Sequence, residues 1–280
     1  MCIIFALLSL VFSSINDFVF KIFSKQGIAK GTYISIIGAV WFIFFIPFCD
    51  APFSSLNSTT IYYGVLSGLL GAIANLLLIE AMRTSEVSVA SMIYRLNLIP
   101  AALCSIFLFN ESLSLGKILG ISFAVTAVFF ISPIKNKTSI SWATYATLII
   151  AALFRAGMAL FYKQATLEDI NIYQLLILNG AIWVICGAIY TIAFERKSCP
   201  SFVKAHWKYG IVSGLLCCGI VLFLAKGLEA GEASIVVPIS QLGFIGTAIL
   251  GVLVIKEELT LRKCVAFSMG ILCIASMSSF

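Results

Sequence analysis

The feature that most constrains this chain is a succession of ten long apolar stretches, each bounded by charged residues, glycine or proline. A membrane-spanning helix needs about 20 residues, and lipid obliges each span to satisfy its own backbone hydrogen bonds. The stretches are continuous rather than alternating, which excludes the strands of a membrane barrel. We therefore predict an all-α integral membrane protein with ten transmembrane helices, at residues 3–23, 32–48, 61–80, 87–108, 116–133, 141–162, 172–194, 208–228, 233–255 and 262–279.

Composition excludes the alternatives to this architecture. The 280 residues are 61% hydrophobic and 11% charged, whereas a soluble domain carries about 25% charged residues. Ten helices use roughly 200 residues, which leaves no room for a separate soluble domain. The first stretch has no basic segment before it and no cleavage site after it, so we predict a retained helix rather than a signal peptide.

The two halves of the chain repeat each other. A shift of 146 residues places 63–132 on 209–278, so that "YGVLSGLL" meets "YGIVSGLL". Nearer the start of each half, a shift of 142 pairs Trp41 with Trp183. We predict two five-helix repeats, 1–134 and 135–280. Because five is odd, the second repeat enters the membrane from the opposite side, as in many secondary transporters.

The basic residues carry an orientation signal. Of the 18 Lys and Arg, thirteen lie in odd-numbered loops and three in even-numbered loops. The positive-inside rule then places the odd loops in the cytoplasm and both termini outside. The net charge of +6 is explained by this bias, so nucleic acid is not an expected partner. We predict a multi-pass protein of the bacterial inner (plasma) membrane, a monomer or weak homodimer.

No sequence motif points to catalysis or to a cofactor. The nine cysteines form no CxxC pair, and the single histidine is His206, so neither a metal site nor a disulfide framework is expected. Nucleotide-binding GxxxxGK[ST], GxSxG and HExxH motifs are missing. We predict a protein that is not an enzyme and that needs no cofactor.

Several local patterns resemble a known family. The pattern "SSINDFVFK", with Asn16 and Lys21, is similar to the first helix of the EamA-type ten-helix carriers of the drug/metabolite transporter superfamily. "AMRTSEVSVASMIYRLNLIP" and "FNESLSLGKILG" resemble later elements of that family and recur in the second half. The usual Trp-Gly of helix one is Ser13-Ser14 here. The resemblance implies carriage of a small metabolite by alternating access without ATP hydrolysis. Many members keep their termini in the cytoplasm, which is opposite to the charge bias.

Two arginines within the spans are the strongest functional candidates. A charge within hydrocarbon is costly and usually faces a bundle interior or a water-filled cavity. Arg95 aligns with Gln241 in the repeat, which suggests an anion anchor with a neutral hydrogen-bonding partner. Alternatively, Arg95 binds carbonyls freed by a helix break at Pro100. Arg155 is either a second anion contact or an interfacial arginine that extends to the membrane surface.

The acidic residues have structural and functional interpretations. Asp17 either forms an ion pair with Lys21, four residues along the same helix, or couples transport to protons. Glu80 is expected to pair with Arg83. Glu111 and Glu257 precede equivalent helices and are expected to cap the helices that follow them.

The remaining candidates are polar residues and prolines. Substrate contacts are expected from Tyr94, Asn16, Asn75 and Ser240, and hinges or helix breaks from Pro100 and Pro238. The predicted function is secondary transport of a small polar, anionic or zwitterionic metabolite, such as an amino acid, with lipid as the surrounding medium. Two alternatives stay open: uptake of a nucleoside-like or amino-acid-derived metabolite, and a membrane-embedded enzyme or lipid-linked sugar flippase component.

Overall fold

The computed structural model describes residues 1–23, 29–50, 56–82, 85, 87–131, 141–195 and 204–278, and throughout these ranges the regular structure is helical, without strands. The fourth and ninth expected spans are each divided into two helices, and two other helices end in a 3-10 or π turn. The elements are α1 Cys2–Phe23, α2 Lys30–Phe45 with the turn Ile46–Phe48, α3 Ser58–Ala81, α4 Val87–Arg95, α5 Leu98–Leu108, α6 Leu115–Ile131, α7 Trp142–Leu167, α8 Ile172–Tyr190 with the turn Thr191–Glu195, α9 Lys204–Ala230, α10 Ala233–Gln241, α11 Gly243–Ile255 and α12 Leu261–Ser278.

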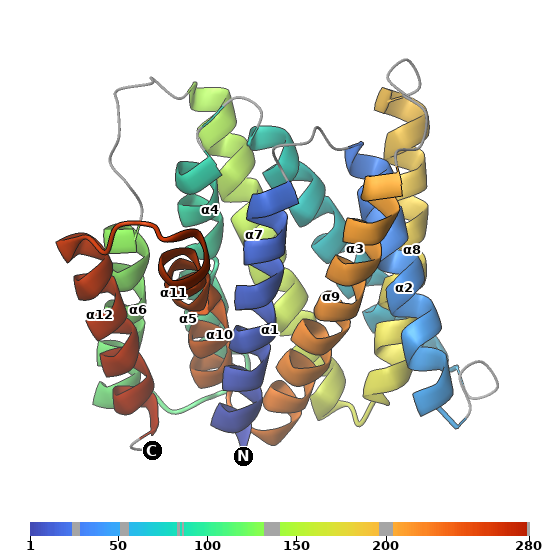
Figure 1. Ribbon diagram of the computed structural model, residues 1–280. Helices are drawn as coiled ribbons and strands as arrows, with labels where there is room; N and C mark the ends of the chain where they lie inside the picture. Colours follow the sequence, from blue (N-terminus) through green and yellow to red (C-terminus); the bar gives the residue numbers. More distant parts are fainter. Residues whose placement is uncertain are drawn as a thin grey trace.

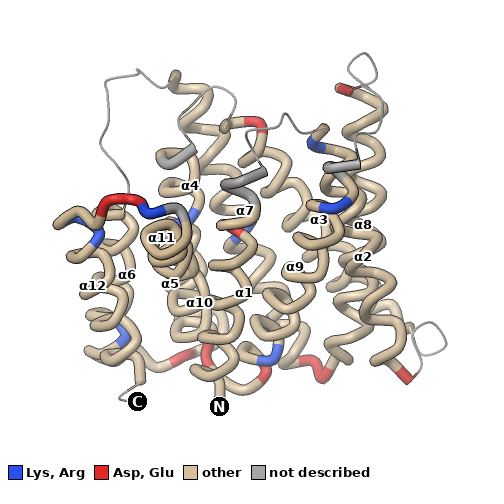
Figure 2. Tube along the Cα trace, in the orientation of Figure 1, with Lys and Arg blue, Asp and Glu red and all other residues tan. Residues whose placement is uncertain are grey.

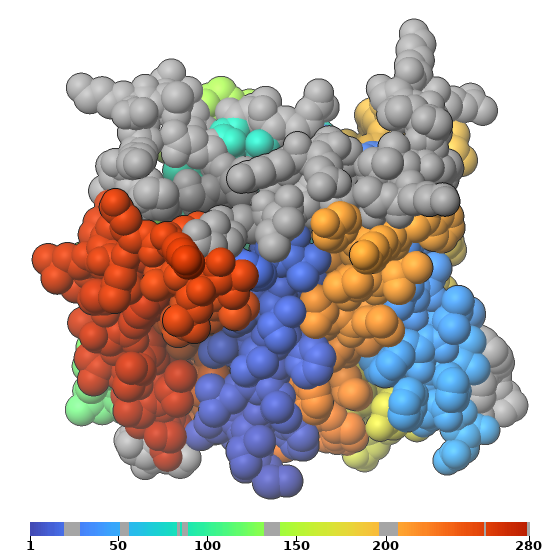
Figure 3. Space-filling model, viewed as in Figure 1, coloured from blue at the N-terminus to red at the C-terminus, as the bar shows by residue number. Residues whose placement is uncertain are grey.

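The helices form a bundle in which partners far apart in sequence lie side by side. Helix α2 packs on α8 at one flank and α6 packs on α12 at the other, while α1 with α9 and α3 with α7 lie between them (Figure 1). Both chain ends lie at the same end of the bundle, which we call the termini side (Figure 1). On the face drawn in Figure 3, α1 is exposed between α9 and the α11–α12 pair.

The distribution of side chains is that of a membrane protein. Nine helical segments in the described ranges are long and apolar enough to cross a membrane, and α6 is apolar but shorter. Large apolar residues are turned outward, such as Leu153, with 52% of its surface exposed, and Leu253, with 71%. Such patches are unfavourable in water and favourable in lipid. Charged positions gather mostly at the two ends of the bundle (Figure 2).

Glycine allows α2 and α8 to approach each other closely. A Cβ atom on Gly180 would lie 2.6 Å from the backbone nitrogen of Phe42, and one on Gly38 would lie 2.7 Å from that of Val184. Neighbouring Trp41 and Trp183 fill the space beside this contact, with ring centroids 5.2 Å apart and an edge-to-face geometry. Small residues at a helix interface give lipid-embedded helices the close packing that holds them together.

This contact gives a stability prediction. The substitution Gly180→Ala forces backbone apart and should lower the free energy of unfolding by about 1–3 kcal/mol, the usual cost of overpacking. The control is Gly157→Ala, whose new methyl group meets only the tip of Leu70, at 3.2 Å. The measurement is the melting temperature of each purified variant. Equal melting temperatures for the two variants would contradict the close-packing account.

Candidate functional site

Two helices are interrupted at equivalent points of the two halves. Helix α4 ends at Arg95 and α10 ends at Gln241, and the 146-residue shift places these two residues on each other. Helix α5 begins at Leu98, after two intervening residues, and α11 begins at Gly243, after one. Each interruption leaves backbone carbonyls without their usual helical donors, which makes them available to other groups.

The prolines lie near the breaks but not at them. Pro100 occupies the first turn of α5, where it has no N–H to offer the carbonyl of Leu96, and that carbonyl accepts from the N–H of Ile99 at 3.0 Å instead. Pro238 lies inside α10, three residues before its end. In the first half the break comes before the proline, and in the second half it comes after the proline. The position of the break itself is equivalent in the two halves.

A partly buried ion pair joins the two breaks to α1. The Nη2 atom of Arg95 pairs with the carboxylate of Asp17, and its Nη1 atom donates to the backbone carbonyl of Gln241 at 2.9 Å. The ring of Phe244 lies 5.3 Å from the guanidinium carbon. The side chains of Arg95 and Asp17 are 13% and 32% exposed. Arg95 thus has a counter-charge, a carbonyl freed by the opposite break and an aromatic face.

The contacts of Asp17 and Gln241 in the structure differ from those expected from the sequence. Asp17 forms its ion pair across the bundle with Arg95, and the side chain of Lys21 lies outside the described residues. The contribution of Gln241 to Arg95 is its backbone carbonyl rather than its side-chain amide. A cation at the carboxyl end of α10 also interacts favourably with the helix dipole.

The second arginine has a different environment. Arg155 lies near the middle of α7, and its Nη1 atom contacts the sulfur of Met158 at 3.1 Å. Its guanidinium has no carboxylate partner among the described residues. Tyr94, on α4, is close enough for the charges of Arg155, Arg95 and Asp17 all to act on its hydroxyl. Asp17 forms its direct ion pair with Arg95, and the charge of Arg155 also acts on the Asp17 carboxylate.

Several buried polar atoms near these residues have no hydrogen-bond partner in the described part of the chain. On α1 and α4 these are the side-chain oxygen of Asn16 and the hydroxyl of Tyr94; on α2 and α8 they are the indole nitrogens of Trp41 and Trp183. Buried polar groups are nearly always paired, so unpaired ones are candidates for contact with a ligand.

Two expected contact residues are instead bonded within their own helices. Asn75 donates from Nδ2 to the carbonyl of Gly71 at 2.9 Å, and Ser240 donates from its hydroxyl to the carbonyl of Val237 at 2.8 Å. Neither bond crosses between helices. Gly71, whose carbonyl accepts this bond from Asn75, faces Met158 and Trp183.

One buried cluster was not expected from the sequence. Asn179 accepts from the Tyr162 hydroxyl at 2.8 Å and donates to Ser67 at 2.9 Å and to the carbonyl of Gly64 at 3.0 Å. It thereby joins α8 to α7 and α3. Asn179 also donates to the carbonyl of Leu175 in its own helix at 2.9 Å. Its partners on other helices are 17 to 115 residues away in sequence, so local sequence does not predict them.

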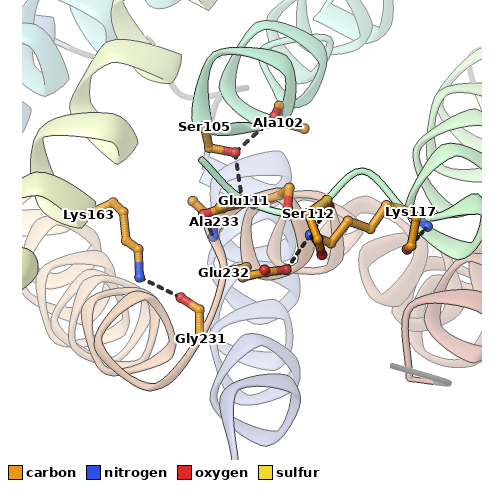
Figure 4. A network of polar contacts seen from close by, with 11 residues as sticks. Ala102, Ser105, Glu111, Ser112, Lys117, Lys163, Gly231, Glu232 and Ala233 are labelled. Carbon is orange, nitrogen blue, oxygen red and sulfur yellow. Dashed lines mark hydrogen bonds and ion pairs between the residues drawn. The ribbon is translucent and has the colours of Figure 1, made fainter. Parts of the chain in front are cut away.

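A second polar network lies at the termini side of the bundle, and Figure 4 shows it from close by. The carboxylate of Glu111 accepts from the N–H groups of Ala233 and Ser234, at 2.7 and 2.9 Å, and from the hydroxyl of Ser105 at 3.2 Å. Glu111 therefore caps the beginning of α10, 122 residues away, and the expectation that it caps the following helix α6 is wrong. A carboxylate suits this place because the amino end of a helix carries unpaired N–H groups and positive potential.

Two lysines complete the network. Lys117, 1% exposed, forms an ion pair with Glu232 and donates to the carbonyl of Ser112 at 2.5 Å. Lys163 donates to the carbonyls of Leu228 and Gly231 at the end of α9, both at 2.8 Å. Charged groups from α6, α7 and the loop before α6 thus hold both sides of the α9–α10 corner.

Two other acidic residues, Glu80 and Glu257, lie at the opposite end of the bundle. Glu80 pairs with Lys30 at 2.5 Å and accepts from the Tyr190 hydroxyl at 2.9 Å, while its expected partner Arg83 lies outside the described residues. Glu257 pairs with Lys263 at 3.3 Å, the counterparts of Glu111 and Lys117 in the repeat. No group of three or more potential metal ligands occurs within the described ranges.

The fold and this interior define a class: a multi-span helical membrane protein whose two broken helices meet at a partly buried ion pair. The EamA-like transporter family model matches residues 1–132 and again residues 141–279. The chain therefore belongs to the EamA-like transporter family, within the drug/metabolite transporter superfamily. It is an integral membrane protein of a transporter family, as the sequence motifs predict.

Two further comparisons bear on the fold. An uncharacterized protein of Methanocaldococcus jannaschii is 28% identical over 131 residues, which are 47% of this chain and 92% of that protein. A solved crystal structure of a protein superposes with a TM-score of 0.81 over 98% of this chain and 95% of that chain, at 14% identity. The second likeness shows that the fold is shared.

The termini-side network gives a prediction. Glu111→Gln removes the charge and one of two acceptor oxygens, so one buried N–H of α10 loses its partner at a cost of about 1–3 kcal/mol. The control Glu229→Gln affects only an exposed pair with Lys226 and should change stability by less than about 1 kcal/mol. Thermal unfolding of both variants measures the difference. A Glu111→Gln protein as stable as the wild type would contradict the capping role.

Proposed function

We propose that this protein is a secondary carrier that moves a small anionic or zwitterionic metabolite across the membrane by alternating access. One observation carries the proposal: Arg155 lies partly buried near the middle of α7, with a sulfur contact and no ion pair to an acidic residue among the described residues. An unpaired guanidinium in a low-dielectric interior attracts a carboxylate or phosphate from the cargo, and its planar fork suits either group.

Arg95 takes another role in this proposal. Its charge is already balanced by Asp17, and its second Nη atom is bound to the Gln241 carbonyl. Cargo that binds here first has to displace Asp17. Arg95 and Asp17 therefore act as a lock between α1 and the two breaks, and Asp17, when released, is the candidate for taking up a coupling proton. Tyr94, Asn16 and Asn75 are the proposed neutral contacts between the two arginines.

The proposed carrier consists of two inverted repeats, and their relative movement exposes the interior to one side of the membrane at a time. The 146-residue shift places the two helix breaks on each other. The pairing of α1 with α9 corresponds to that of α7 with α3, while α2–α8 and α6–α12 correspond to themselves. The Methanocaldococcus jannaschii relative, matched over 92% of its length by 47% of this chain, has room for one such repeat. These observations support boundaries near residues 134 and 135.

The polar network of the termini side fits the closed half of such a cycle. Lys117 is 1% exposed there, whereas its counterpart Lys263 at the other end is 20% exposed. Opening the termini side separates Glu111 from α10 and Lys163 from the end of α9. Pro100 and Pro238, beside the two breaks, are the proposed places where the helices bend.

Transport assays test the anchor role of Arg155. In proteoliposomes loaded with a panel of amino acids, nucleotides and sugar phosphates, Arg155→Gln should lower exchange of the cargo at least tenfold without lowering the melting temperature. The control Arg262→Gln removes a half-buried arginine whose side chain, within the described part of the chain, donates to the Phe129 carbonyl at 3.4 Å, and this variant should transport normally. Undiminished exchange by the Arg155→Gln protein would contradict the proposal.

A double-mutant comparison tests the lock. Asp17→Asn alone leaves the buried Arg95 cation unpaired and should destabilise the protein by about 3–5 kcal/mol. Adding Arg95→Gln removes the charge as well and should recover most of that loss. The readout is thermal unfolding of the two single variants and the double variant. A double variant less stable than both single variants would show that the two charges are not coupled.

We also propose that the termini lie outside the inner membrane and the opposite end lies in the cytoplasm, because basic residues favour that end by thirteen to three. Cysteines introduced at the exposed positions Asp169, on the termini side, and Glu258, opposite, distinguish the orientations. A membrane-impermeant thiol reagent added to intact cells should label Asp169→Cys above the wild-type background and leave Glu258→Cys unlabelled. The reverse pattern would place the termini in the cytoplasm.

A further inference from the structure

The thioether sulfur of Met158 is the contact that the Arg155 guanidinium makes among the described residues. We propose that a carboxylate of the cargo displaces this thioether and bridges the Arg155 guanidinium and the indole N–H of Trp183, which makes the carrier selective for monoanionic carboxylates. The inference rests on the proposed carrier function and adds to it the chemical class of the cargo and a second recognition residue.

Arg155 and Trp183 present two donors near the Met158 sulfur, and of these two only Arg155 contacts it. The sulfur of Met158 lies 3.1 Å from Nη1 of Arg155. A Cβ atom at residue 71 of α3 would lie at a point 2.8 Å from this sulfur and 3.4 Å from the indole nitrogen of Trp183. Residue 71 is glycine, so this point holds no side-chain atom of α3.

Neither donor is well satisfied. The indole nitrogen of Trp183 is buried, and no acceptor for it occurs in the described part of the chain. A thioether sulfur is a weak hydrogen-bond acceptor, and methionine is the apolar side chain that repacks most easily. Met158 itself is 1% exposed. A carboxylate has two strong acceptor oxygens, one for each donor, and the flexible thioether can swing away to admit it.

The charges around this point select the kind of anion. Arg155 has no direct carboxylate partner among the described residues, while Arg95 pairs directly with Asp17. An anion leaves water at low cost only where its charge is matched. Arg95, Arg155 and Asp17 together carry one net positive charge, which matches the single charge of a carboxylate and leaves a phosphate dianion with an uncompensated charge.

The repeat supplies a matched control. Trp41 is the equivalent of Trp183 and is also buried with an unpartnered indole nitrogen. The residue equivalent to Gly71, however, is Cys217, so the second half has a side chain at the corresponding place. The proposed carboxylate contact therefore belongs to Trp183 and not to Trp41.

The experiment is calorimetric titration of the purified full-length protein in nanodiscs at pH 8 with benzoate, phenyl phosphate and benzamide. Benzoate should bind at least tenfold more tightly than the other two. Trp183→Phe should weaken benzoate about tenfold, whereas Trp41→Phe should change it less than twofold. Met158→Ala removes the competing sulfur and should strengthen benzoate severalfold. Melting temperatures confirm that each variant is folded.

Three results would overturn the inference: no benzoate binding by the wild type, equal effects of the two tryptophan substitutions, or phenyl phosphate that binds as tightly as benzoate. If Arg155→Gln abolishes exchange while Trp183→Phe and Met158→Ala leave benzoate affinity unchanged, the carrier function stands and the bridging site is refuted. If Arg155→Gln leaves exchange intact, the carrier proposal itself fails.

Discussion

The ion pair between Asp17 and Arg95 is the interaction on which the centre of this bundle depends. A single charge in this interior is expensive, and each of the two residues compensates the other. The pair also joins three elements, because Arg95 ends α4, Asp17 lies on α1 and the third partner is the Gln241 carbonyl at the end of α10. Two helices can break inside a membrane because protein groups take up the freed carbonyls.

The two arginines illustrate how the same residue type acquires different roles. Arg95 has a carboxylate, a carbonyl and the ring of Phe244 around it, whereas Arg155 has the sulfur of Met158. A fully bonded guanidinium holds helices together, and a poorly bonded one attracts a ligand. The difference between the two arginines is clear because the chain has few charged residues and few other ionic groups lie within the spans.

Much of the architecture could be predicted from the sequence, because apolar length and the repeat are local or periodic signals. The alignment of the two halves by itself places Arg95 opposite Gln241. The partners of Asp17 and Glu111 could not be predicted, since they lie 78 and 122 residues away and depend on how the helices pack. From local sequence, Glu111 is expected to cap the next helix along the chain. The packing of the bundle brings the start of α10 to it instead. Met158 and Trp183 carried no sequence signal beyond apolar character and a repeat match.

The most direct test of the account is a structure of the protein with 4-bromobenzoate bound, in which the bromine marks the ligand position. The account predicts a carboxylate at Arg155, with the Met158 side chain turned away and the Asp17–Arg95 pair intact. Ligand density at Arg95, with Asp17 displaced and Met158 still against Arg155, would contradict it.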